Sequence, residues 1–380
     1  MFGDYFWRNS FSRFPSVGYF IIGIVMCLSI LGLIILFSAS QEMYANPLSL
    51  IYKQILWMAI GLFLAYVIFR LNLEKIRPFI PLIGIIALLL LCMVLVPGLG
   101  VKVNGAQRWL DFGFMRLQVS EVSKIALLLC LADYLAVNRR SIDMVKEGFV
   151  YPFLILGSCV IAIFLEPDYG TAFLCGLVGC VLFFISGMKL KYLLPVVGIA
   201  LVIFSIAIFL NPERLSRITS FLDVESNRSD SGYQLWQGIV AFGVGGIDGV
   251  GLGNGRQQMS FLPEAHTDFI FSVIGEELGM FVTLGVVFLF LALFLVVLMH
   301  LKYAPNFYQY LLVLGALLFI EFQALINIGV VTGSLPTKGM PLPFISYGGS
   351  NLVLMFVLIA LILNCLCHWT IVPLKEGREL

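Results

Sequence analysis

Ten long apolar stretches, each bounded by charged residues, proline or glycine, constrain this chain of 380 residues more than any other feature. A helix needs about 20 predominantly apolar residues to cross a bilayer. The stretches lie near 17–38, 52–69, 78–96, 119–137, 149–165, 168–187, 191–210, 269–299, 308–332 and 351–371. Their number and length predict an all-α fold, a polytopic integral membrane protein of about ten transmembrane helices.

The composition supports the same class of protein. Hydrophobic residues make up 60% of the chain and charged residues 12%, whereas roughly a quarter of the residues in soluble domains are charged. The 23 basic and 22 acidic residues give a formal net charge of +1, so we expect no basic face and no nucleic-acid partner. Because we find no repeat and no linker, residues 1–380 are predicted to form a single transmembrane domain.

The distribution of lysine and arginine predicts the orientation of the helices. The first apolar stretch follows Arg8 and Arg13 but is longer than the apolar region of a secretory leader, so we expect a retained anchor. Basic residues then concentrate in alternate short loops, which predicts that both termini are cytoplasmic. Two long connections, 97–118 and 211–268, are therefore predicted outside, and the larger one forms an extracytoplasmic loop between spans seven and eight.

A glycine-rich segment, 238–255, lies inside that larger loop and carries eight glycines. It lacks the spacing and the strand-helix context of a dinucleotide-binding motif. The segment is too short and too rich in glycine to span, so we expect a re-entrant or interfacial loop, or else a simple connector.

Three ionisable residues, Glu264, His266 and Asp268, follow within five positions at the outer boundary of the eighth span. They are candidates for catalysis, although a solvated helix cap is an equal alternative because an aspartate is favoured at a helix N-terminus. At the start of the fourth span, Glu121 and Lys124 are three residues apart and share a helix face. They predict either a structural ion pair or a cation presented to an anionic lipid head group.

Three glutamates lie within predicted spans, where charged groups are costly and usually face polar partners. Glu276 and Glu277 lie two turns after Asp268, and Glu321 lies in the middle of span nine. We expect polar partners for all three. All eight cysteines lie in or at the ends of spans, so no extracellular disulfide framework is predicted.

Several motifs in order resemble one known family over nearly the whole chain. They are Arg108-Trp109, Gln118-Val119-Ser120-Glu121, Pro167-Asp168-Tyr169-Gly170-Thr171, Pro263-Glu264-Ala265-His266-Thr267-Asp268-Phe269, Leu335-Pro336-Thr337-Lys338-Gly339 and Pro343-Phe344-Ile345-Ser346-Tyr347-Gly348-Gly349-Ser350. The chain resembles the SEDS proteins (shape, elongation, division and sporulation), which polymerise bacterial cell-wall glycan from a lipid-linked precursor. Ala265 and the 336–339 motif resemble the cell-division branch more than the elongation branch. The chain departs from the usual family residues at Val119, Glu166 and Asn351.

The resemblance implies a peptidoglycan glycosyltransferase that polymerises lipid II, a disaccharide-peptide on undecaprenyl pyrophosphate, into glycan strands at the division septum. The family's essential aspartate falls on Asp268, the implied catalytic base. The implied substrate-binding residues are Arg116, Glu121, Lys124, Asp168, His266, Glu264, Lys338 and Ser346. A pyrophosphate leaves as a stable anion, so the reaction requires a base and positive charge on the phosphates but no general acid. Arg116 and Lys124 suit the second task, with a divalent cation, Mg²⁺, on Glu121 and Asp168.

Two other functions remain open. A lipid II flippase would need polar lining through the bundle, for which Glu321, Gln323 and Asn327 are candidates. A non-catalytic scaffold of the division machinery would need no outer ionisable cluster. The resemblance also implies a class B penicillin-binding protein transpeptidase and other divisome proteins as partners, and a place in the bacterial cytoplasmic membrane at the septum.

Overall fold

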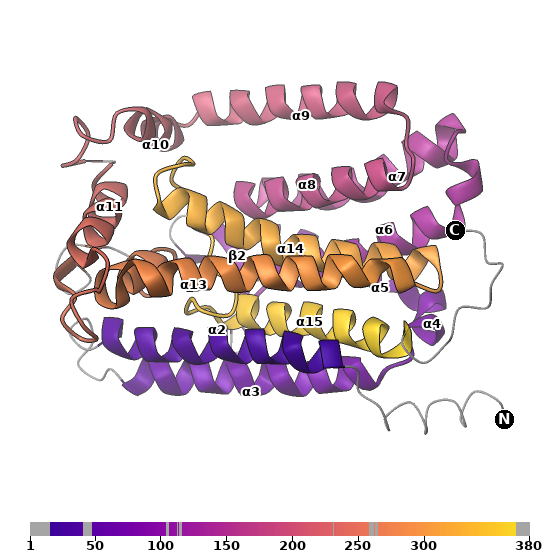
Figure 1. Cartoon of the computed structure of the whole chain (residues 1–380). Helices are drawn as coiled ribbons and strands as arrows, with labels where there is room; N and C mark the ends of the chain where they lie inside the picture. The colour runs from indigo at the N-terminus through magenta and orange to yellow at the C-terminus, as the bar shows by residue number, and fades with distance from the viewer. Residues whose placement is uncertain are drawn as a thin grey trace.

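The computed structural model describes residues 16–40, 48–103, 106–111, 113, 116–230, 232–257, 262 and 265–369. The chain folds into a bundle of long helices (Figure 1). The helices are α2 (Ser16–Ser40), α3 (Leu48–Arg70), α4 (Leu73–Ile76), α5 (Ile80–Leu95), α6 (Val119–Val137), α7 (Tyr151–Leu165), α8 (Tyr169–Ile185), α9 (Leu190–Phe209), α10 (Pro212–Leu222), α11 (Tyr233–Gly245), α13 (Ile270–His300), α14 (Phe307–Val331) and α15 (Gly349–Trp369).

Each predicted apolar stretch overlaps one of these helices, and the prediction of a polytopic, largely helical membrane protein is confirmed. Within the described ranges, eight helical segments are long and apolar enough to cross a membrane. The helices α6 and α8 are not among them: α8 has 17 residues, and α6 carries Glu121, Lys124 and Asp133. The orientation predicted from the basic residues remains a prediction.

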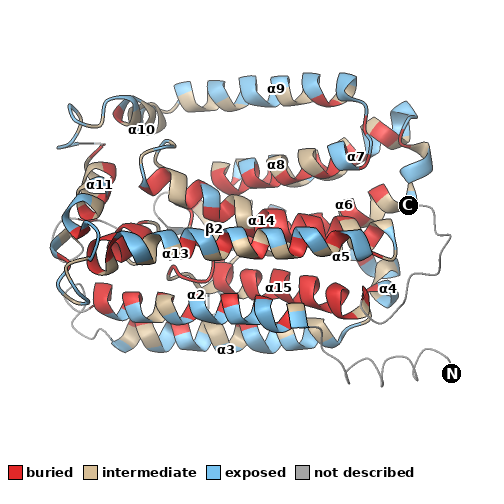
Figure 2. Ribbon diagram, in the orientation of Figure 1, coloured by how far each residue is buried: buried red, intermediate tan, exposed pale blue. Residues whose placement is uncertain are grey.

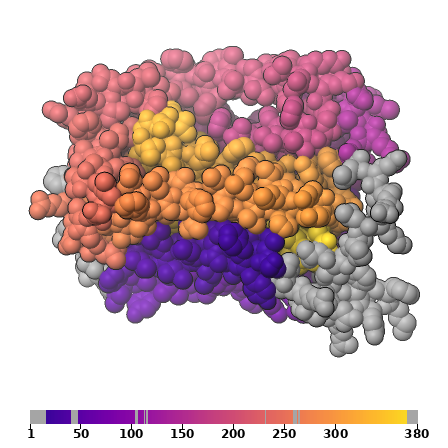
Figure 3. All heavy atoms as spheres, viewed as in Figure 1, coloured from indigo at the N-terminus to yellow at the C-terminus, as the bar shows by residue number. Residues whose placement is uncertain are grey.

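Two helices form the centre of the bundle. In their most apolar windows, 78% of the α14 residues and 89% of the α15 residues are buried, compared with 6% for α9. Figure 2 shows the same contrast between the buried α15 and the exposed α9. Leu193 is the only buried residue that α9 contributes, and Figure 3 shows an opening beneath this helix. The polar side chains of α14 and α15 therefore lie inside protein rather than against lipid.

One end of the bundle carries most of the non-helical chain, and we call it the loop end. Figure 1 shows α10 and α11 there, whereas α2 begins and α15 ends at the opposite end. The 97–118 connection forms a small antiparallel sheet in the order β1 (Gly100–Val103), β2 (Ala106–Asp111) and β3 (Arg116–Gln118). The sheet is tied to the start of α15, because the Gln118 backbone N–H donates to Ser350 Oγ at 3.1 Å.

The glycine-rich segment divides into two parts. Residues 238–245 belong to the helix α11, and the following turns lie against α13. The segment is therefore a short helix and a turn bound to a neighbouring helix, and its expected place at the membrane interface remains a prediction. Close approach requires the glycines: a Cβ on Gly245 would lie 2.0 Å from the Gly275 carbonyl oxygen.

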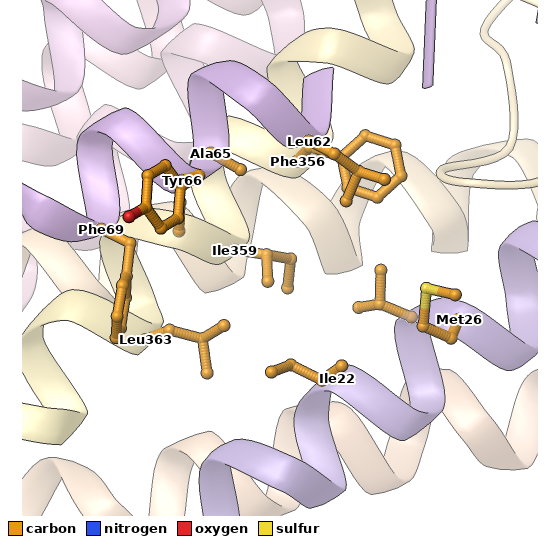
Figure 4. A pocket seen from close by; sticks show the side chains of 11 residues that line it. Ile22, Met26, Leu62, Ala65, Tyr66, Phe69, Phe356, Ile359 and Leu363 are labelled. Carbon is orange, nitrogen blue, oxygen red and sulfur yellow. The ribbon is translucent and has the colours of Figure 1, made fainter. Parts of the chain in front are cut away.

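A separate apolar pocket of about 230 Å³ lies among α2, α3 and α15 (Figure 4). Its lining includes Met26, Leu62, Tyr66, Phe356 and Leu363. Apart from the Tyr66 hydroxyl, these side chains offer no polar group for chemistry, so the pocket is not a candidate active site.

Candidate functional site

The turn that carries Asp268 is fixed by α14 and by the segment between α14 and α15. Its backbone is held at three successive positions: Tyr347 N–H donates to His266 O at 3.0 Å, Ser346 Oγ donates to Thr267 O at 2.7 Å, and Asn327 Nδ2 donates to Asp268 O at 2.8 Å. The Asp268 side chain is half-buried and lies on Gly339, since a Cβ there would be 2.5 Å from Oδ2. The backbone of Asp268 is therefore fixed, and the residue as a whole is only half-buried.

Lys338, the neighbour of Gly339 in the chain, lies over the start of α8. A Cβ on Gly170 would be 2.4 Å from Lys338 Cε, and Lys338 Nζ is 5.6 Å from the centre of the Phe173 ring. Within the described part of the chain, this ammonium makes no ion pair. Burial lowers the pKa of Lys338 to about 8, with Asp168 opposing and Arg108 adding to the change. It is a half-buried cation available to an anionic ligand.

Asp168 caps α8 and links it to the start of α6. Its Oδ1 accepts from the Thr171 backbone N–H at 3.3 Å, as an N-cap carboxylate does. Its Oδ2 accepts from Gln118 Nε2 at 3.0 Å and from Ser120 Oγ at 3.1 Å. The hydrogen bonds of this buried carboxylate join two sequence motifs at one place.

Arg108 on β2 holds the turn that precedes Asp168. Its Nε donates to Glu166 O at 3.2 Å and its Nη2 donates to Pro167 O at 2.6 Å, while Nη1 lies 3.9 Å from Asp168 Oδ1. In the sequence, Arg108 stands out only as part of a motif, and its role in this turn was not predicted. The contact spans 58 residues, so no local pattern could have shown it.

Glu166 in the same turn is a fully buried carboxyl group. Neither of its side-chain oxygens has a hydrogen-bond partner in the described structure. Burial, followed by the neighbouring Asp168, raises the pKa of Glu166 to about 8, although Arg108 opposes the change. The side chain is therefore a neutral acid at pH 7.

Glu121 and Lys124 form a buried ion pair on α6. Lys124 Nζ lies 2.9 Å from Glu121 Oε2, with only 2% and 7% of the two side chains exposed. Glu121 also accepts from Asn351 Nδ2 at 3.1 Å, and Lys124 donates to Gln323 Oε1 at 3.3 Å. These bonds join α6, α14 and α15, which supports the structural alternative that the sequence left open for this pair.

Two polar residues of α14, Gln323 and Asn327, bind chain segments at the loop end and do not line a polar path through the bundle. Gln323 Nε2 donates to Pro341 O at 2.9 Å and to Asn351 Oδ1 at 3.1 Å. Asn327 Nδ2 bonds to Met340 O at 2.6 Å as well as to Asp268 O. Their i, i+4 spacing places both on one helix face, a signal that could have predicted a shared partner. Glu321 differs, since its Oε1 is buried without a hydrogen-bond partner among the described residues.

The other predicted site residues differ in how accessible they are. Arg116 is exposed on β3 and pairs with Asp111 at 3.1 Å. The pKa of Asp111 is lowered first by a hydrogen bond from the Gly113 backbone N–H and then by the hydrogen bond from Arg116. Ser346 is buried, and its hydroxyl also accepts from the Leu342 backbone N–H at 2.7 Å. The half-buried His266 ring lies 6.0 Å from the Tyr347 ring. Glu264 lies outside the described residues.

The residues expected to hold a divalent cation do not form a ready site. Glu121 Oε2 is occupied by Lys124 and Asn351, and Asp168 accepts from two side chains and a backbone N–H. Among the described residues, no three His, Cys, Asp or Glu side chains gather as a metal site would require. We therefore derive no chemical step through a bound metal.

Comparison with known proteins connects this geometry to one family. Residues 19–370 match the FtsW/RodA/SpoVE family, described as cell cycle proteins. The chain is 39% identical over 354 residues to a probable peptidoglycan glycosyltransferase FtsW of Coxiella burnetii, covering 90% of this chain and 94% of that protein. A Legionella pneumophila protein of the same description is 38% identical over 361 residues, covering 90% and 89%.

Solved structures show the same fold. The chain superposes with a TM-score of 0.76 and 25% identity on a chain from a study of polymerization and crosslinking by a peptidoglycan synthase complex, covering 92% of this chain and 97% of that one. It superposes on the rod shape determining protein RodA of Thermus thermophilus with a TM-score of 0.67 and 26% identity, covering 90% and 94%.

Proposed function

Because the chain belongs to the FtsW/RodA/SpoVE family, we propose that it is a peptidoglycan glycosyltransferase that polymerises lipid II for septal wall synthesis in bacterial cell division. The observation that supports this activity best is the environment of Asp268. Asp268 is half-buried, and its backbone carbonyl is held at the loop end by Asn327. Gly339, the residue that follows the unpaired Lys338, lies against the Asp268 carboxylate. Two neighbouring residues of one segment thus reach different parts of the predicted site: Gly339 lies against Asp268, and the Lys338 side chain lies over the start of α8.

In this proposal, Asp268 accepts the proton of the attacking sugar hydroxyl. The new glycosidic bond forms at the anomeric carbon of lipid II as its bond to the pyrophosphate breaks, and the pyrophosphate leaves as an anion. No general acid is needed, unlike in the hydrolysis of ordinary glycosides. Asn327 holds the backbone of Asp268, which limits the geometry available to the base and so favours a reactive arrangement.

Lys338 stabilises the charge that develops on the leaving pyrophosphate. It is better placed for this task than Lys124, whose ammonium is buried in an ion pair with Glu121. Arg116 is exposed and can exchange Asp111 for a phosphate as the lipid head group arrives. A divalent cation bound with the substrate would supply positive charge to its phosphates without the protein ligands, Glu121 and Asp168, expected from sequence. Activity with EDTA against added Mg²⁺ tests that requirement.

A class B penicillin-binding protein is the proposed partner, supported by the likeness to a peptidoglycan synthase complex.

The flippase alternative loses two of its three candidate lining residues, because Gln323 and Asn327 are hydrogen-bonded to backbone carbonyl groups at the loop end. We place the protein in the cytoplasmic membrane with both termini inside and at the septum, together with other divisome proteins.

The test is a reconstitution of the purified chain in liposomes with fluorescent lipid II, with and without the penicillin-binding protein. We expect glycan polymer from the wild type, more of it with the partner, and none from Asp268→Asn, which preserves volume but removes the base. Transbilayer movement of lipid II without polymer would favour the flippase, and neither activity would favour the scaffold. Polymer from Asp268→Asn within a few-fold of wild type would exclude Asp268 as the base.

A further inference from the structure

The helix α13 is interrupted at Gly279, where φ is 74° and ψ is −173°. The Met280 backbone N–H therefore turns to Gly246 O and Ile247 O, at 3.0 and 3.1 Å, instead of continuing the helix. In return, the Glu276 and Glu277 carbonyl groups accept from Val250 N–H at 2.9 Å and Gly251 N–H at 3.0 Å. The turn 246–257, which we call the inserted turn, thus exchanges backbone hydrogen bonds with the broken helix.

Only glycine fits at two points of this exchange. A Cβ on Gly279 would lie 2.3 Å from Ile247 O, and a Cβ on Gly249 would lie 2.3 Å from Glu277 O. Both residues also have positive φ values of 74° and 77°, which other residues rarely adopt. The close contact of the two backbones is therefore built into the sequence.

Two buried carboxylates add a second layer of contacts to the same turn. Glu276 Oε1 accepts from the backbone N–H groups of Arg256 at 2.7 Å and Gln257 at 3.0 Å. Glu277 Oε1 accepts from Gly253 N–H at 2.9 Å. Both glutamates are at most 1% exposed. The polar partners expected for these two glutamates are therefore backbone N–H groups of the inserted turn.

The end of α2 is joined to the same contacts. Ser38 Oγ donates to Glu277 Oε1 at 2.5 Å and accepts from Gly253 N–H at 3.0 Å. The inserted turn is followed in the chain by the residues that lead to Asp268. The backbone N–H of Gln257 donates to Glu276, and the backbone carbonyl of Gln257 accepts from Leu262 N–H at 2.8 Å. Leu262 and Ala265 are buried, and Asp268 follows them by one turn.

We propose that Glu276 and Glu277 are positioning residues for the reaction: they hold the inserted turn on α13 and thereby fix the approach of the chain to Asp268. They act as hydrogen-bond acceptors and do not touch the substrate. The substitution Glu276→Gln keeps a carbonyl oxygen for the N–H groups of Arg256 and Gln257, whereas Glu276→Met keeps the length but offers only a weakly accepting thioether sulfur. An acceptor role and a charge role are therefore separable.

The experiment compares wild type, Glu276→Gln and Glu276→Met for lipid II polymerisation and for hydrogen exchange of peptides covering 250–257. We expect Glu276→Met to lower kcat by about tenfold or more, since small displacements of a catalytic group are costly, with KM for lipid II changed by less than about twofold. Exchange in 250–257 should accelerate in the same variant. Glu276→Gln should stay within about threefold of wild type in kcat, because its carbonyl still accepts both N–H groups.

Two further variants keep the proposal falsifiable if Glu276→Met folds poorly. Ser38→Ala removes only the contacts of one hydroxyl, and we expect a smaller fall in kcat with faster exchange at Gly253. Glu321→Met changes a half-buried glutamate outside the inserted turn, and we expect unchanged exchange in 250–257. Faster hydrogen exchange in Glu276→Met with an unchanged kcat would overturn the positioning role. A fall in kcat in Glu276→Gln as large as that in Glu276→Met would overturn it as well. The inference rests on the proposed polymerase activity, but an inactive wild type would instead contradict the proposed function.

Discussion

The carboxylate of Asp268 lies so close to the backbone of Gly339 that a single methyl group at position 339 would come within 2.5 Å of Oδ2. Two segments separated by about 70 residues of chain thus meet with no space for a side chain between them. The contact makes residue 339 a direct probe of where the base must be.

The substitution Gly339→Ala should therefore displace the Asp268 carboxylate without removing it. We expect polymerisation of lipid II to fall by about tenfold or more, while thermal stability stays close to wild type because the displaced group is half-exposed. Gly348→Ala is the matched control in the same segment, since its Cβ would meet only Asn351 Cβ at 3.8 Å. Equal activity in the two variants would show that the carboxylate has another productive position.

Lys338 predicts an alkaline limit to activity. Because burial lowers its pKa to about 8, its ammonium loses a proton as the pH rises through that value, and the charge on the pyrophosphate is no longer compensated. We expect wild-type polymerisation to decline above about pH 8, whereas Lys338→Arg should keep its pH profile flat there, because a guanidinium stays charged. The profiles should be measured with Glu166→Gln as a common background, so that ionisation of Glu166 makes no contribution. A decline in Lys338→Arg identical to that of the parent would exclude Lys338 as its source.

Glu166 predicts a pH dependence of stability. Its pKa is raised from 4.5 to about 8 in the folded protein, so the folded state retains a proton that the unfolded chain releases above its ordinary pKa. Stability must therefore fall as the pH rises between these two values. Glu166→Gln removes the ionisation, and its gain in melting temperature over wild type should increase from pH 5 to pH 8. A constant difference across this range, measured by fluorescence-monitored unfolding in detergent, would contradict the buried neutral acid.

The buried pair of Glu121 and Lys124 should respond as a unit. Removing one partner leaves a buried charge and should destabilise the protein by about 3–5 kcal/mol, so Lys124→Met and Glu121→Gln should each lower the melting temperature strongly. The double variant should recover much of this loss, since no uncompensated charge remains. If polymerisation recovers together with stability in the double variant, the pair has a structural role. A stable but inactive double variant would instead indicate that Lys124 binds the phosphates.

The sequence predicted what depends on local pattern and missed what depends on tertiary contact. The apolar stretches predicted the helices because about 20 apolar residues have few alternatives in a membrane. The three-residue spacing of Glu121 and Lys124 likewise predicted a shared helix face, and the ion pair that the structure shows was one of the two alternatives left open. The sheet was missed, although Asn104-Gly105 between two short alternating stretches is a strong hairpin signal.

The contacts that build the site were harder to predict. Arg108 binds carbonyl groups 58 and 59 residues away, and the sequence contains no spacing that encodes this. The break at Gly279 was also hidden, because a glycine in an apolar run does not by itself end a helix. The break depends on hydrogen bonds from the inserted turn, which become visible only when the two segments are placed together.

That break also settles how much of α13 the bilayer must accommodate. An uninterrupted helix over Ile270–His300 would be about 46 Å long at about 1.5 Å per residue, far more than the roughly 30 Å of a hydrocarbon core. The part after Gly279 is about 20 residues long, which matches that thickness without tilt or local thickening of the lipid. We expect the excess length to lie outside the hydrocarbon as a short rod, with the aspartate turn near the depth of the lipid phosphates. A polyprenyl-linked substrate can therefore present its pyrophosphate to this turn without leaving its own leaflet.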